Sequence, residues 1–165
     1  MKYILIAIFL ALGIVSRLIP HAPNFTPILA ISLMSGIYLK KRYIVLLPIS
    51  IMLFSDLIIG SHSTVFWVYI SLISISIIGQ MIRNNISNVV IHSILSSILF
   101  FIVTNFGVWS LGGYGYTFQG LLMCYTMAIP FFNNTLFSTF IFSIGIYMAH
   151  YIIEFYSVKY QLSNL

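Results

Sequence analysis

Charged side chains are scarce in this sequence. Among its 165 residues there are seven Lys and Arg residues and two acidic residues, so only 5% of the chain is charged while 61% is hydrophobic. Soluble domains carry roughly 25% charged residues. This composition excludes an ordinary water-soluble domain. We therefore predict that residues 1–165 form a single all-α integral membrane domain of transmembrane helices.

Cysteine and the common catalytic motifs are also rare or missing. Cys124 is the only cysteine, which excludes an intrachain disulfide and a Cys-x-x-Cys metal site. The sequence contains no Gly-x-Ser-x-Gly, His-Glu-x-x-His or phosphate-loop motif. We therefore predict that the protein is not an enzyme and uses no cofactor or metal ion. An intramembrane hydrolase built from a serine and a histidine is the alternative.

Long apolar runs are plentiful, and six of them are candidate membrane spans, because a spanning helix needs about 20 mostly apolar residues. The six runs cover approximately residues 2–19, 27–39, 43–59, 65–82, 86–109 and 131–153. The second run is short for a span, and Pro48 predicts a kink in the third. A Gly/Tyr-rich break at 111–117 precedes another apolar piece at 118–129, for which we predict a short interfacial or re-entrant helix.

The basic residues predict the orientation. If the amino terminus is cytoplasmic and there are six spans, the basic residues on the inside are Lys2, Lys40, Lys41, Arg42, Arg83 and Lys159. Only Arg17 then lies near the outer face, as the positive-inside rule favours. We therefore predict a multi-pass protein of the inner (cytoplasmic) membrane with both termini in the cytoplasm. The net charge of +5 is then explained by lipid headgroups, and no nucleic-acid partner is expected.

Arg17 and Asp56 are predicted to lie about one turn inside the outer ends of the first and third spans. Charges at such depth commonly pair or mark a substrate path, so we expect these two to pair or to share a ligand. A purely structural ion pair is the alternative. Segment 17–27, Arg-Leu-Ile-Pro-His-Ala-Pro-Asn-Phe-Thr-Pro, holds three prolines. It is predicted to be a stiff outer loop covering a pocket, with His21 and Asn24 in it.

Amide and aromatic side chains gather near the predicted outer end of the fifth span. Asn105 lies about one turn inside the bilayer and needs a partner, and Asn133 at the start of the last span is placed to converge with it. Trp109 and Tyr116 suit ring stacking, although anchoring in an interfacial aromatic belt is the alternative. Apolar walls with amides suit a small, flat organic molecule. The predicted substrate site thus comprises Arg17, His21, Asn24, Asp56, Asn105, Trp109, Tyr116 and Asn133.

Four stretches of the sequence carry a family resemblance: segment 17–60, Thr104-Asn-Phe-Gly-Val-Trp109, Gly120-Leu-Leu-Met-Cys-Tyr125 and Ile129-Pro-Phe-Phe-Asn-Asn134. In these stretches the chain resembles a family of small bacterial membrane transport proteins of uncharacterised function. In size, span count and the proline loop after the first helix, that family is similar to the S components, or substrate-binding membrane subunits, of energy-coupling factor transporters.

This resemblance implies a six-helix bundle that captures a vitamin-like micronutrient at the outer face. It also implies partners: a separate transmembrane coupling subunit with two ATPases, which docks on small residues of the first helix. Ala7 and Ala11 fit that Ala-x-x-x-Ala spacing. The function we expect is therefore a membrane-embedded substrate-binding subunit for uptake. The alternatives are a structural or assembly subunit of a larger membrane complex, and an autonomous proton-coupled carrier in which Asp56 or His150 titrates.

Overall fold

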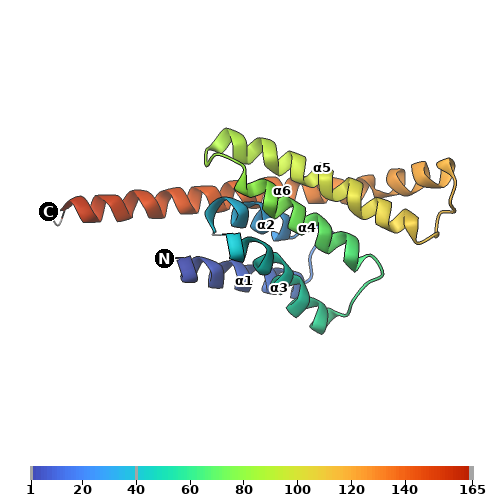
Figure 1. Ribbon diagram of the computed structural model, residues 1–165, viewed down its shortest axis with the longest axis horizontal. Coiled ribbons are helices and arrows are strands. Elements are labelled where there is room, and N and C mark those ends of the chain that lie inside the picture. The colour runs from blue at the N-terminus through green and yellow to red at the C-terminus, as the bar shows by residue number, and fades with distance from the viewer. Residues whose placement is uncertain (1, 40, 164–165) are drawn as a thin grey trace.

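The structure, a computed structural model, describes residues 2–39 and 41–163, with side chains for 4–39 and 43–157. Within these ranges the chain forms six helices and no strands, so the all-helical prediction is confirmed (Figure 1). The helices are α1 (Lys2–Leu18), α2 (Ile28–Tyr38), α3 (Lys41–Ile59), α4 (Val65–Gln80), α5 (Ile86–Ser110) and α6 (Phe118–Ser163).

Capping side chains fix where α5 and α6 begin. The Asn85 side chain accepts a hydrogen bond of 2.9 Å from the Asn88 backbone N–H, and the Thr117 hydroxyl oxygen accepts one of 3.0 Å from the Gly120 N–H. Asn and Thr are favoured at this position because they satisfy N–H groups that the first helical turn leaves unpaired. Both starts agree with the runs that the sequence predicted.

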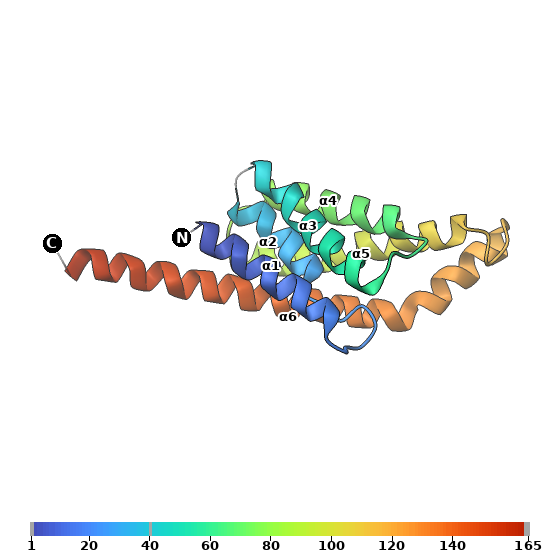
Figure 2. The same ribbon diagram turned by 90° about the horizontal axis from the view of Figure 1, so that it is seen from below.

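The prediction of a separate short helix at 118–129 is wrong. Helix α6 is continuous from Phe118 to Ser163, with Pro130 inside it. A proline removes one backbone hydrogen bond and bends a helix, but it does not have to end one when the flanking residues stay packed. Figure 2 shows this bend in the orange part of α6. The piece predicted to lie in the interface is therefore the first part of the last helix.

Helix α2 is the centre of the bundle. At 11 residues it is about 16 Å long by the usual 1.5 Å rise, roughly half of a bilayer's hydrocarbon thickness. Every residue from Ile28 to Gly36 is buried, and α2 packs against each of the other five helices. The predicted span at 27–39 is therefore a short helix enclosed by protein. Its backbone is satisfied within the helix, so burial leaves few unpaired polar groups.

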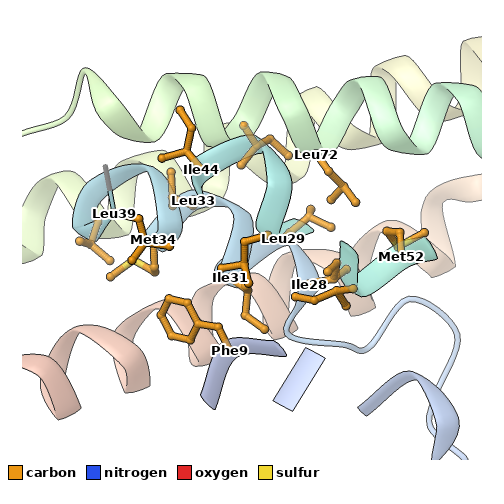
Figure 3. Packing of buried hydrophobic residues seen from close by; sticks show 14 residues of the cluster. Phe9, Ile28, Leu29, Ile31, Leu33, Met34, Leu39, Ile44, Met52 and Leu72 are labelled. Atoms are coloured by element: carbon orange, nitrogen blue, oxygen red, sulfur yellow. The ribbon is translucent and has the colours of Figure 1, made fainter. Parts of the chain in front are cut away.

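The hydrophobic core surrounds α2. Figure 3 shows Ile31, Leu33 and Met34 of this helix packed among Phe9 of α1 and Leu72 of α4, all of them almost fully buried. Such contacts are individually weak, but a buried aliphatic side chain makes dozens of them. Val89 of α5 belongs to the same core, and Ile146 of α6 packs against it. Figure 1 shows that α6 extends past the other helices.

Glycines allow the backbones of α2 and α4 to come into direct contact in this core. A Cβ atom added at Gly36 would overlap the backbone of Ser76 and Gly79, and one added at Gly79 would overlap the Leu33 carbonyl oxygen. The α2 and α4 backbones therefore touch directly at this crossing. Small residues permit such contact, which lets a short helix pack tightly without large side chains.

Two helices, α5 and α6, are long and apolar enough to cross a membrane, as judged by length and composition. The apolar parts of the other four helices are shorter. Figures 1 and 2 show that the start of α1 and the last part of α6 lie at the same end of the bundle. Helix α6 continues well past the other helices at that end.

Candidate functional site

The loop at 19–27 lies against α6, more than a hundred residues away in sequence. Asn134 donates a side-chain hydrogen bond of 3.0 Å to the Pro23 carbonyl oxygen, and the Ser138 hydroxyl donates one of 3.4 Å to the Asn24 carbonyl oxygen. Asn24 has φ of 62°, a left-handed conformation that Asn tolerates better than most residues. These two hydrogen bonds hold the loop against α6.

A cavity of about 170 Å³ lies between this loop and helices α4, α5 and α6. Four phenylalanines form most of its wall, and small aliphatic side chains complete the apolar part. Its polar side chains belong to two asparagines and two threonines, and no charged side chain of the described residues lines it. The phenylalanines are Phe100, Phe101, Phe131 and Phe132, and the polar residues are Asn24, Thr104, Asn105 and Thr135. An apolar cavity with a few polar groups is the usual form of a small-molecule site.

The two cavity asparagines have unused hydrogen-bonding capacity. Asn105 donates its side-chain N–H to the Phe101 carbonyl oxygen at 2.7 Å, while its Oδ1 has no partner among the described residues. The side-chain amide of Asn24 likewise has no partner in the described part of the chain, and only its backbone carbonyl is bonded. Asn24 is exposed and Asn105 is half-buried, so these free groups lie at the open part of the cavity, where a ligand can pair with them.

The two cavity threonines have already used their hydroxyl protons. Thr104 donates to the Phe100 carbonyl oxygen at 2.7 Å, and Thr135 donates to the Phe131 carbonyl oxygen at 3.0 Å, each one turn back along its own helix. A hydroxyl that donates in this way retains oxygen lone pairs. Both threonines can therefore act only as acceptors towards a ligand while these bonds persist.

Arg17 and Asp56 form an ion pair, which confirms the expectation that they pair. Arg17 Nη2 lies 2.7 Å from Asp56 Oδ1, and the two side chains are only 15% and 7% exposed. The pair is extended by other groups: Arg17 Nη1 donates to Ser55 Oγ at 2.7 Å and contacts Met52 Sδ, and the Tyr69 hydroxyl donates to Asp56 Oδ2 at 3.2 Å. The cluster joins α1, α3 and α4, and its members do not line the cavity.

Trp109 and Tyr116 fold the turn at 111–117 onto the end of α5. Trp109 donates its indole N–H to the Gly115 carbonyl oxygen at 3.0 Å, and the Trp109 and Tyr116 rings meet edge to face at 6.1 Å. Gly112 and Gly115 have φ of 83° and 76°, a region that side chains disfavour. These two aromatics hold the turn closed and lie outside the cavity lining.

Residues 1–161 match the model of a family of unknown function, DUF6580. The chain belongs to this family. No curated protein matches the chain, and no solved structure does. The family carries no assigned activity, so the roles of these residues are argued from their geometry and chemistry.

The remaining predicted residues are exposed. His21 lies in the loop with its Nδ1 atom 2.7 Å from the Ile19 carbonyl oxygen, and Asn133 faces outward from α6. On α1, Ala7 and Ala11 are both exposed, so this face is open to a partner. Among the described residues no group of His, Cys, Asp and Glu is arranged to hold a metal ion.

Apart from Asn24 and Asn105, the sequence did not predict the cavity-lining residues, although those on α5 and α6 share a simple spacing. On α5 the lining positions 101, 104, 105 and 108 follow the i, i+3, i+4, i+7 pattern of one helix face, and 128, 131, 132 and 135 repeat it on α6. The pattern on α5 is visible in the sequence. The one on α6 spans Pro130 and emerges only if 118–163 is treated as one helix.

Proposed function

We propose that this protein is a membrane-embedded subunit that captures a vitamin-like small organic micronutrient beneath the loop at 19–27, for uptake into the cell. The single observation that supports this most strongly is the cavity of about 170 Å³ in which two side-chain amides keep free hydrogen-bonding groups beside aromatic walls. Its described lining has no carboxylate, histidine, lysine or thiol. It therefore offers none of the usual general acids or bases, so we propose binding rather than catalysis.

The proposal places the whole bundle in the inner membrane. Large apolar side chains are exposed on every helix that surrounds α2, for example Leu57 at 74% and Phe118 at 69%. In water such a surface would promote aggregation, whereas acyl chains would solvate it. In this arrangement α2 and the loop at 19–27 together return the chain across the membrane, so the proposed multi-pass topology does not require α2 to span alone.

We propose that both termini lie in the cytoplasm. Of the basic residues behind this orientation, Lys40 and the side chains of Lys2, Lys41, Arg42 and Lys159 lie outside the described part of the chain. Arg83 lies in the α4–α5 connection, at the same end as the start of α1 (Figure 1). The cavity, bounded by the loop after α1, is near the opposite end and would face outward.

The likeness to energy-coupling factor S components supplies the partners in this proposal. The sequence has no phosphate-loop motif, so energy for uptake would come from a separate coupling subunit with ATPases, docked on the exposed face of α1 that carries Ala7 and Ala11. Asp56 is engaged by Arg17 and Tyr69. An autonomous carrier that titrates Asp56 would have to break this cluster, so it is less well supported.

The experiment is mass spectrometry of the small molecules that are released when the detergent-purified protein is denatured. We expect a specific compound from the wild type and much less of it from Asn105→Leu, which removes the unpaired cavity oxygen at similar volume. The matched control is Gln80→Leu, the same amide-to-leucine change at an exposed position at the far end of α4. Release of no specific compound, or of equal amounts from wild type and Asn105→Leu, would count against the proposal.

A further inference from the structure

The chemistry of the cavity lining narrows the class of ligand, on the basis of the proposed binding function. Thr104 and Thr135 offer only acceptors, through their hydroxyl oxygens. Asn105 offers its free Oδ1 and the second N–H of its amide, and Asn24 offers both an N–H donor and an acceptor. A ligand that satisfies this lining must itself carry hydrogen-bond donors, because a ligand with acceptors alone would leave the two threonine oxygens and Asn105 Oδ1 without a partner.

The volume of the cavity accommodates one ring. A protein cavity of about 150 Å³ holds benzene, and this cavity is about 170 Å³. Aromatic rings attract one another in offset or edge-to-face geometry, and the wall already contains such a pair, Phe101 and Phe132, whose centroids are 4.8 Å apart. A flat, six-membered ring with one or two small substituents fits both the space and the wall.

The absence of charge in the described lining argues for a neutral ligand. An ionised group placed here would lose its water without gaining a counter-charge, which is strongly unfavourable in an apolar site. Arg17 and Asp56 do not supply that counter-charge, because they neutralise each other outside the lining. Glu154, the other acidic residue, lies one helical turn after His150 on α6 and does not line the cavity.

We infer that the ligand is a neutral, single-ring heteroaromatic compound with an amino or amide N–H group. In the bound state that N–H donates to Asn105 Oδ1, a second polar edge of the ring meets the Asn24 amide, and the ring faces lie against the phenylalanines. This inference deepens the proposed function by assigning the class of compound that the cavity takes.

The test is calorimetric titration of the detergent-purified wild type with probes that differ in one property each. Cytosine, 2-aminopyrimidine and nicotinamide are neutral rings with N–H donors. Benzene lacks the donors, benzoate is an anion, and benzyltrimethylammonium is a cation. We expect at least one donor ring to bind about tenfold more tightly than benzene, the effect of roughly one buried hydrogen bond, and the two ions to bind more weakly than that ring.

Variants identify the atoms responsible. Asn105→Leu and Thr104→Val should each weaken binding of the donor ring several-fold without changing benzene binding. Thr126→Val is the matched control, because Thr126 makes the same one-turn-back hydrogen bond to Leu122 but is exposed and outside the cavity. Thermal unfolding of each variant shows whether it is folded. If Asn105→Leu does not fold, Thr104→Val tests the same acceptor chemistry independently.

The outcomes separate this inference from the proposed function. Tighter binding of benzoate or benzyltrimethylammonium, or no donor ring exceeding benzene, would overturn the ligand class. The proposed function would still stand if a compound is released from the wild type and lost in Asn105→Leu. If no compound is released and no probe binds, both fail. A released compound that is charged or contains fused rings would overturn the inference alone.

Discussion

Arg17 and Asp56 show how far single residues can be interpreted from sequence. They are the two charges predicted at similar depth, and because an unpaired charge in an apolar bundle is so unfavourable, their pairing could be predicted. The hydrogen bond from Tyr69 to Asp56 could not be predicted, because a phenol has many possible partners. Asn24 and Asn105 were likewise predicted to bind a ligand. Trp109 and Tyr116 instead hydrogen-bond to residues only six positions away in and beside the turn, and the shape of that turn could not be predicted from the sequence.

The ion pair should couple α1 to α3 strongly. Arg17→Met leaves Asp56 charged and without its main partner, so we expect the free energy of unfolding to fall by about 3–5 kcal/mol. Arg17→Met combined with Asp56→Leu removes both charges and should cost clearly less than the two single changes added together. Unfolding titrations of the four proteins in mixed micelles give this double-mutant cycle. Additive losses would show that the two side chains do not interact energetically.

At the scale of elements, five of the helices follow from the apolar runs of the sequence, whereas α6 does not. The Gly/Tyr segment at 111–117 is a turn as predicted, but the predicted break between segments 118–129 and 131–153 falls at Pro130, where the structure shows a bend in one helix. Local sequence cannot decide between these, since the outcome depends on packing against α5. The short length of α2 could be predicted from the sequence. Its position at the centre of the bundle could not, because that position depends on contacts with every other helix.

The α2–α4 crossing gives a prediction about packing. Gly79→Ala places a methyl group on the Leu33 carbonyl oxygen, and overpacking of this kind typically costs about 1–3 kcal/mol. Gly145→Ala is the control, because a Cβ atom there meets nothing within 4 Å. Alanine also favours a helix over glycine by up to about 1 kcal/mol. Thermal unfolding in detergent should therefore show a lower midpoint for Gly79→Ala and an unchanged or higher one for Gly145→Ala; equal shifts would contradict the close crossing.

At the scale of the whole molecule, the composition predicted an apolar helical protein, and the alternation of helix directions places the start of α1 and the end of α6 together (Figures 1 and 2). The cavity could not be predicted, because it is formed where segments far apart in sequence meet: the loop after α1, the start of α4, the second half of α5 and the first half of α6. Hydrogen bonds across more than a hundred residues hold that arrangement.

The proposed orientation can be tested with introduced cysteines, since native Cys124 is buried. Ala22→Cys lies in the exposed loop beside the cavity, and Ser87→Cys lies exposed at the opposite end, in the first turn of α5. With a membrane-impermeant maleimide, we expect Ala22→Cys to be labelled in intact spheroplasts and Ser87→Cys only after the membrane is opened. The wild type controls for labelling of Cys124. The reverse pattern would mean that the cavity faces the cytoplasm.

The central claim, that the cavity binds a small molecule, is tested most directly by counting the compound released per chain when the purified protein is denatured. The account predicts about one molecule per chain from the wild type and from Gln80→Leu, as expected for one binding site, and about a tenth as much from folded Asn105→Leu. No specific compound from the wild type, or the same yield from folded Asn105→Leu, would contradict it.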